Sequence, residues 1–360
     1  MTTTKSVLLT VSGRIPADLD DQVAAGRRPR ADYRVMRDAF DADLVDVDVA
    51  LSRTGRLGRL LHRLGGAGLL LGWYCFRHRH RYEVIVSDGE QVGLPLALLS
   101  RVFGRGTARH MMIVHILSTR TKARLVRHAR LAGQIDRYVV YCSWQRDFIR
   151  DALGVPAECI VLSTFMVDTA FFDPAAVSVD QERMICTAGL ERRDYATLME
   201  AVNDLDVEVV IAAASPWSKR SDTTERAVLP PNVEVRKLSL FELRELYARS
   251  RFVVMPLEEV EFQAGITTIL EAMSMGRTVL CTRTSGQTDT VTEGETGRYV
   301  RPNDAAALRD AIRGMLDDEA FAIDAGRRAR EWVVNNADIE VYARRLSAEV
   351  DAALRPRQVG

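Results

Sequence analysis

The segment FVVMPLEEVEFQAGITTILEAMSMGRTVLCTRT, residues 252–284, contains a complete β-α-β pattern. Its two apolar runs, at 252–257 and 278–284, predict buried strands. The stretch that begins near Gly265 predicts the intervening helix, because apolar residues recur at i, i+3, i+4 and i+7: Ile266, Ile269, Leu270 and Met273. Strands joined by a crossover helix lie parallel, so the segment predicts a parallel α/β sheet.

The same helix carries polar residues that we assign to its other face, Thr267, Glu271 and Ser274. Gly265 permits close approach of the backbone, and the free N–H groups of the first turn lie at the positive end of the helix dipole. This arrangement suits a diphosphate, and Glu271 is placed to accept hydrogen bonds from vicinal hydroxyls such as those of a ribose. A solvated polar stripe on a surface helix is the alternative interpretation.

The β-α alternation extends outward from this segment over nearly the whole chain. Further strands in the second half are predicted at 184–189, 207–215 and 233–239, and the first half predicts six strands, at 6–13, 43–50, 83–89, 111–117, 137–143 and 159–167. The pattern breaks at 167–183, which we interpret as a linker. We therefore expect two tandem Rossmann-like domains with ligands in a central cleft, divided as 1–172, 173–336 and a C-terminal helix, 337–360, that packs back toward the first domain.

The composition is that of an ordinary globular protein. Of the 360 residues, 47% are apolar and 27% charged, and 49 basic residues balance 49 acidic ones. A net charge of zero gives no electrostatic reason to expect nucleic acid as a partner. The five cysteines are scattered and never form CxxC, which favours reduced thiols in a cytoplasmic protein.

A charge-poor stretch near the N-terminus, Leu64 to Phe76, has arginines on both sides. It is too short to span a bilayer, and we see no secretory signal before it. A core-facing helix is one interpretation of this region. The other is peripheral membrane contact through residues 57–81, because an apolar segment in a basic frame can lie on a membrane surface.

Taken in order along the chain, these motifs resemble those of glycosyltransferase family 4, retaining enzymes of the GT-B fold. The resemblance rests on the loop, glycine and Glu-bearing helix of 261–282, on the following TRTSGQTDTVTEGETG, on VDTAFFDP at 167–174 and on LRELYARSRFVVMP at 243–256. It implies a retaining, hexosyltransferase-type enzyme that moves a sugar from a nucleotide diphosphate sugar, a UDP-sugar above all, to an unidentified acceptor hydroxyl: a small molecule, lipid or glycan.

The resemblance also assigns roles in binding the donor. Glu271 matches the second of two family glutamates eight residues apart, and the first position holds Gln263 instead. The donor loop and helix start would then consist of Gln263, Ala264, Gly265, Ile266 and Thr267. The turn at 187–202 resembles the family's phosphate-binding turn, where Leu190 replaces the usual arginine and Arg193, with Arg192 beside it, lies nearest the expected lysine.

Three further loops complete the expected site. Lys219, in SPWSKR after a predicted strand, would reach the diphosphate or the base. In the first domain, Gly13 lies in a loop that resembles the family's loop beneath the donor diphosphate. His115 resembles the family's catalytic histidine, which lies near the reacting sugar. Asp88 and Glu90 would line the acceptor side.

No His or Asp spacing typical of a metal site is present in the sequence, so we expect a metal-independent enzyme without a cofactor. Two other functions fit the same fold. One is a glycoside synthase or phosphorylase that uses a sugar phosphate or free phosphate. The other is a catalytically silent GT-B module that binds a nucleotide or a partner, which the departures at Gln263 and Leu190 favour.

Overall fold

The computed structural model describes residues 5–213 and 228–355. The chain forms two compact units, each built on its own parallel sheet. Unit 1 comprises 1–20, 31–163 and 342–360, and unit 2 comprises 21–30 and 164–341. The chain therefore passes from unit 1 to unit 2 after Ser163, nine residues before the boundary expected at 172.

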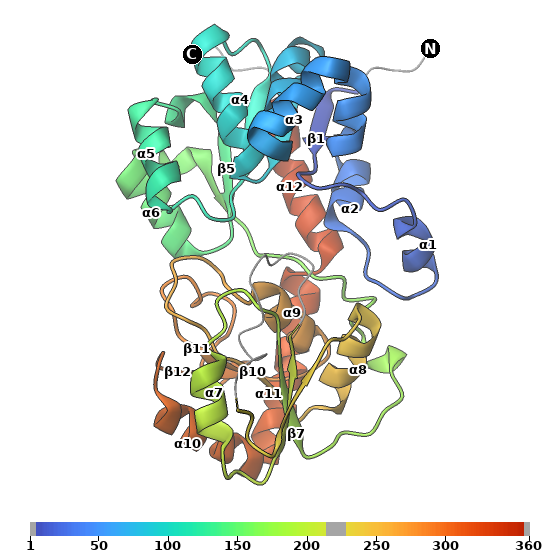
Figure 1. Cartoon of the computed structure of the whole chain (residues 1–360), viewed down its shortest axis with the longest axis vertical. Coiled ribbons are helices and arrows are strands. Elements are labelled where there is room, and N and C mark those ends of the chain that lie inside the picture. Colours follow the sequence, from blue (N-terminus) through green and yellow to red (C-terminus); the bar gives the residue numbers. More distant parts are fainter. Residues whose placement is uncertain (1–4, 214–227, 356–360) are drawn as a thin grey trace. The chain divides into compact units, whose positions relative to one another are not determined.

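Unit 1 has a six-stranded sheet with the order β2-β1-β3-β4-β5-β6, and all of its strand pairs are parallel. The strands are β1 (Val7–Thr10), β2 (Ala42–Val45), β3 (Val84–Asp88), β4 (Arg109–Ile113), β5 (Arg137–Val140) and β6 (Ile160–Leu162). The helices up to Ser163 are α1 (Leu19–Ala24), whose last four residues belong to unit 2, α2 (Asp32–Ala39), α3 (Val47–His78), α4 (Glu90–Phe103), α5 (Arg120–His128) and α6 (Ser143–Leu153). Figure 1 shows α3 and α4 side by side against this sheet.

Unit 2 repeats the design with the order β12-β11-β10-β7-β8-β9, again all parallel. Its strands are β7 (Met184–Ala188), β8 (Glu208–Ala212), β9 (Val233–Arg236), β10 (Val253–Met255), β11 (Val279–Thr282) and β12 (Gly297–Val300). The helices are α7 (Tyr195–Val202), α8 (Leu240–Arg249), α9 (Ile266–Ser274), α10 (Ala305–Asp317) and α11 (Glu319–Asn336). The last helix, α12 (Ile339–Leu354), begins in unit 2 and continues into unit 1 from Tyr342.

Alternation along the strands of unit 2 builds two separate cores. Cys186, Val253 and Met255 pack with α8, α9 and α11 on one face of the sheet. Ile185 and Val254, their neighbours in sequence, pack with α7 and α10 on the other face. A parallel sheet covered on both faces needs apolar side chains at consecutive positions, which is the pattern that identified these strands.

The C-terminal helix is fixed to unit 1 by buried and charged contacts. The hydroxyls of Tyr141 and Tyr342 lie 2.8 Å apart in a buried pair. The guanidinium of Arg137 lies 3.4 Å from the carboxylate of Glu349. The last residues of the chain are therefore part of unit 1, the unit in which the chain begins.

Three sequence expectations about elements were wrong. The stretch 43–50 is a strand only to Val45, because the Asp46 carboxylate accepts a hydrogen bond from the Val49 N–H at 2.9 Å and starts a helix there. The predicted strand 159–167 forms only at β6. The short GRYV strand β12 was missed, since four residues beside a polar loop give little periodic signal.

Candidate functional site

The turn that follows β7 holds a buried cation. Gly189 has a φ of 92°, and a Cβ there would lie 2.6 Å from Nη2 of Arg193, so the turn requires glycine. The Arg193 guanidinium donates to the carbonyl of Ala188 at 2.9 Å and to that of Glu191 at 2.7 Å. Arg193 is buried, and its position is therefore set by the backbone of the turn itself.

This turn is joined to the loop that follows β10, the neighbouring strand. The Asp194 N–H donates to the carbonyl of Pro256 at 3.1 Å, and the Glu258 N–H donates to that of Arg192 at 3.0 Å. A side-chain ion pair between Arg192 and Glu258, at 3.0 Å, adds to these bonds. The carboxyl ends of β7 and β10 thus form one cross-linked edge, the edge at which parallel α/β sheets bind ligands.

Helix α9 begins at this edge. Gly265 caps it with a φ of 78°, and a Cβ there would lie 2.7 Å from Sδ of Met255. The alternative interpretation, a solvated polar stripe on a surface helix, was wrong: every residue of α9 except Thr267 is buried. Ser274, for example, donates from its hydroxyl to the carbonyl of Phe172 at 2.7 Å. Apolar neighbours surround the helix, because α8 and α11 pack against the side to which the sequence pattern assigned the polar residues.

Glu271 lies in this buried environment and is electrostatically coupled to Arg193. Its Oε2 accepts a hydrogen bond from the Tyr247 hydroxyl at 2.9 Å. Burial raises the pKa of Glu271 to about 8, although the bond from Tyr247 and the charge of Arg193 act in the opposite direction. Burial likewise lowers the pKa of Arg193. At neutral pH the site therefore pairs a protonated carboxylic acid with a buried cation.

A second loop, after β11, holds the donor-loop candidates in place. Gln287, fully buried, donates from Nε2 to the carbonyl of Ala264 at 3.0 Å. Gln263 donates from Nε2 to the Thr290 hydroxyl at 3.4 Å. We assigned no role to Gln287, Thr290 or Tyr247 from the sequence. The polar run SGQTDT at 285–290 was the available signal, since such a run after a buried strand lies at the ligand-binding edge.

Several buried polar atoms around these loops have no hydrogen-bond partner among the described residues. They are Thr187 Oγ1, Arg192 Nε, Gln263 Oε1, Thr284 Oγ1 and Gln287 Oε1. Buried polar groups in native proteins are nearly always paired. This part of unit 2 therefore suits a ligand rich in hydrogen-bonding groups.

Unit 1 brings together its own set of candidates at the carboxyl edge of its sheet. His115 lies two residues beyond the end of β4 rather than in a strand, and its Nε2 lies 3.2 Å from Oδ1 of Asp88. Burial lowers the pKa of His115, but the bond to Asp88 and the charges of Asp88, Glu90 and Asp32 outweigh this and raise it. Asp32 was not among the sequence candidates, and burial together with the charge of Asp88 raises its pKa to about 6.

The other unit 1 candidates differ in what they contact. Glu90 is buried, and its carboxylate accepts from the Ile116 N–H at 2.5 Å and lies 3.6 Å from the ammonium of Lys122. Its carboxylate is therefore engaged inside the fold. Gly13 is exposed in the loop after β1, where an added Cβ would meet no atom within 4 Å. Lys219 lies outside the described residues.

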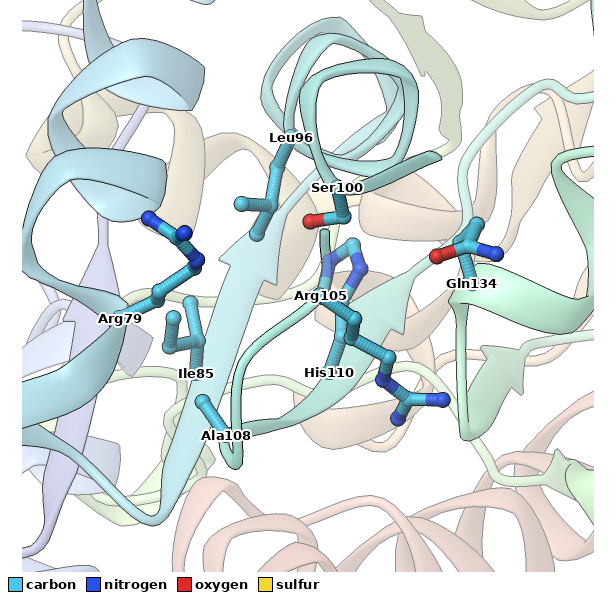
Figure 2. A pocket seen from close by; sticks show the side chains of 8 residues that line it. All are labelled: Arg79, Ile85, Leu96, Ser100, Arg105, Ala108, His110 and Gln134. Atoms are coloured by element: carbon cyan, nitrogen blue, oxygen red, sulfur yellow. The ribbon is translucent and has the colours of Figure 1, made fainter. Parts of the chain in front are cut away.

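A small pocket in unit 1 lies at the opposite edge of the sheet. It is lined by residues at the amino ends of β3 and β4, Ile85 and His110 among them, together with Arg79, Arg105 and Gln134 (Figure 2). Its free volume of about 10 Å³ is at the lower limit of what a single bound water molecule needs. It is too small for a sugar and is separate from the His115–Asp88 pair.

Within residues 5–213 and 228–355, no group of three or more His, Cys, Asp or Glu side chains has an arrangement that could hold a metal ion. None of the helices in these ranges is both long and apolar enough to cross a membrane.

Replacing Glu271 with glutamine tests its protonation state. The pKa of Glu271 is near 4.5 in the unfolded chain and about 8 in the folded one. The folded protein therefore loses stability as the pH rises between these values, because the carboxyl ionises more readily in the unfolded chain. Glu271→Gln removes this loss, so it should stabilise the ligand-free protein more at pH 8 than at pH 5, by up to about 1.4 kcal/mol per pH unit. Melting temperatures measure the difference. Glu261→Gln, at an exposed position, is the control, and an equal effect of Glu271→Gln at both pH values would contradict the raised pKa.

Part of the chain, including this edge of unit 2, is similar in sequence to known glycosyltransferases. Residues 182–318 match the family described as glycosyl transferases group 1. A D-inositol 3-phosphate glycosyltransferase of Corynebacterium aurimucosum is 29% identical over 181 residues, which is 47% of this chain and 42% of that protein. The putative colanic acid biosynthesis glycosyltransferase WcaL of Escherichia coli K12 is 27% identical over 56% of this chain and 53% of its own. The chain thus spans about half the length of these curated relatives.

Solved structures resemble the chain over nearly its full length. A glycosyltransferase of Rickettsia africae has a TM-score of 0.70 at 16% identity, over 98% of this chain and 99% of its own. Anabaena HepE in complex with UDP-glucose has a TM-score of 0.67 at 14% identity, over 97% and 99%. The chain therefore shares the two-unit α/β fold of these solved structures, and its segment 182–318 matches the family described as glycosyl transferases group 1.

Proposed function

We propose that the protein is a retaining glycosyltransferase of family 4 that moves a sugar from a nucleotide diphosphate sugar, UDP-linked, to an acceptor hydroxyl without a metal ion. The observation that carries this proposal is the edge of unit 2 where Arg193, Glu271 and the first turn of α9 meet. This edge lies within the segment that matches group 1 glycosyltransferases. UDP-glucose bound to HepE, a protein of the same fold, supports the choice of donor.

Each part of the donor has a matching group at this edge. The diphosphate is an anion, and the first-turn N–H groups of α9, with Arg193 behind them, supply positive potential for it. Glu271 is protonated at neutral pH, so its carboxyl can both donate to and accept from hydroxyls of the ribose. Gln263, in the loop before the helix, offers an amide to the sugar, where the family usually has a carboxylate.

The proposed chemistry needs few acid or base groups. In a retaining transfer of this kind the acceptor hydroxyl attacks on the face that the diphosphate leaves, and the departing phosphate takes its proton. The protein stabilises the developing charge on the phosphate and positions the two substrates. Arg193 would supply the charge stabilisation. In unit 1, we assign His115 a catalytic role near the reacting sugar and Asp88 a place on the acceptor side. The five free thiols favour action in the cytoplasm.

The central experiment combines donor binding with turnover in EDTA. We expect UDP-glucose or a related UDP-sugar to raise the melting temperature, and the sugar to be transferred or slowly hydrolysed with its anomeric configuration kept. Loss of activity on chelation, restored by magnesium or manganese, would contradict metal independence. Binding without any turnover would instead favour the silent module, and turnover that requires free phosphate would favour a phosphorylase.

Arg193 is the first residue to test. Arg193→Lys keeps a cation but loses the bonds to Ala188 and Glu191, and Arg193→Ala removes the charge. We expect kcat to fall by about 100- to 1,000-fold in the alanine variant, as when a preorganised oxyanion donor is removed. The exposed Arg183→Ala is the matched control. A folded Arg193→Ala variant with wild-type kcat would rule out stabilisation of the leaving group by this residue.

Glu271 and Gln263 should separate the two halves of the donor. Glu271→Ala should weaken UDP and UDP-sugar by the same factor, about 10-fold for the loss of one hydrogen bond between neutral groups. Gln263→Ala should leave the Kd of UDP unchanged, lower kcat/KM for the preferred donor and reduce its advantage over epimeric sugars. Titration calorimetry with both ligands gives the comparison. Equal weakening of UDP and UDP-sugar by Gln263→Ala would show that another residue contacts the sugar.

A further inference from the structure

One segment of this neutral protein carries a net positive charge. Between Asp48 and Glu83 the sequence has no acidic residue but seven arginines: Arg53, Arg56, Arg59, Arg63, Arg77, Arg79 and Arg81. Most of this segment is α3, and the proposed transfer reaction uses none of its residues. The run therefore carries a local excess of positive charge on a chain with no net charge.

Helix α3 is not continuous. Its backbone leaves the helical region at Gly55 and again at Gly65 and Gly66, so residues 56–64 form a short helical piece of their own. This piece, RLGRLLHRL, contacts the rest of unit 1 through Gly58, where an added Cβ would collide with Thr54 and approach Leu70. One side of the 56–64 helix therefore faces the protein, and its other sides are available to solvent.

On the solvent-facing sides of the 56–64 helix, the leucines and the arginines form two separate arcs. At 3.6 residues per turn, Leu57, Leu60 and Leu64 lie within an arc of about 60°, and Arg56, Arg59 and Arg63 occupy an adjacent arc of similar width. The three leucines are 46%, 52% and 71% exposed. Beyond the glycines the pattern reverses, since Leu70 and Leu71 are fully buried. The core accounts for the apolar residues after Gly66 but not for those before it.

The three arginines of the 56–64 helix are exposed, and none forms an ion pair with a carboxylate of the described residues. The 56–64 helix also lies near the carboxyl edge of the unit 1 sheet. Gly68, just after the second break, packs on the backbone of Gln91 at the start of α4. Because α4 begins at the carboxyl end of β3, the 56–64 helix lies at the same edge of the sheet as Asp88 and His115.

We propose that the 56–64 helix docks on an anionic lipid bilayer, with its leucines among the acyl chains and its arginines on the lipid phosphates. Exposed leucines alone would fit any apolar partner, and arginines alone would fit any polyanion. Adjacent apolar and purely cationic arcs on one short helix match the interface of an anionic membrane. Three leucines give reversible, peripheral attachment. This proposal is independent of the proposed reaction, and vesicle binding needs no donor or acceptor.

Co-sedimentation of the full-length protein with vesicles tests the proposal. We expect binding to vesicles of equal phosphatidylglycerol and phosphatidylcholine to be at least tenfold stronger than to phosphatidylcholine alone. The triple variant Leu57→Gln, Leu60→Gln, Leu64→Gln should bind at least tenfold more weakly. The triple variant Arg56→Gln, Arg59→Gln, Arg63→Gln should bind as weakly and lose its salt dependence.

Matched controls come from unit 2. The variant Ile323→Gln, Val334→Gln replaces exposed apolar residues, and Arg313→Gln, Arg327→Gln replaces exposed arginines. Both should bind vesicles as the wild type does, and circular dichroism confirms that every variant is folded. Wild-type vesicle binding by the leucine variant would overturn the proposal. So would arginine-dependent binding to duplex DNA as strong as that to vesicles, or a dimer that only the leucine substitutions dissociate.

Discussion

The candidate donor site depends on a cation and an acid that share a buried place at the edge of the unit 2 sheet. Withdrawal from water disfavours the charged form of each group, so the pKa of Glu271 rises to about 8 and that of Arg193 falls. The charge of Arg193 opposes the rise in the pKa of Glu271 only in part. A carboxylic acid kept protonated at neutral pH reduces the stability of the folded chain, and such a cost is typical of residues retained for binding.

This buried pair constrains the loops around it. Arg193 can remain inside only because the carbonyls of Ala188 and Glu191 accept its N–H groups. Those carbonyls are available because the turn is held to the next strand by Pro256 and Glu258. Polar atoms packed at such an edge must find partners, and several of them have none within the described residues. A donor molecule with many hydroxyls and phosphate oxygens would complete the set.

The sequence predicted the architecture well, because consecutive apolar positions in strands and glycine-led helices are local signals. It also placed Arg193, Gln263, Gly265 and Glu271 in one region, where the order of strands and loops brings them together. It did not predict that α9 would be buried nearly all round, since that depends on which helices pack over it. Gln287 was missed for a similar reason: its bond to the Ala264 carbonyl joins loops 23 residues apart, and no periodicity marks such a contact.

Helix α3 shows that a single stretch of sequence cannot always be assigned to a single environment. A core helix and a membrane-contacting helix were alternative interpretations of one region, yet the backbone changes direction at Gly65 and Gly66, and each side of this break has a different environment. Leu70 and Leu71 follow the core interpretation, while Leu57, Leu60 and Leu64 remain exposed beside arginines that have no carboxylate partner in the part of the chain that the structure describes. Glycine has no Cβ and tolerates the positive φ found at Gly66, so two residues suffice to separate the two environments. An amphipathic stretch should therefore be analysed separately on each side of a break in the helix. Residues at helical spacing share a face only within a continuous helix.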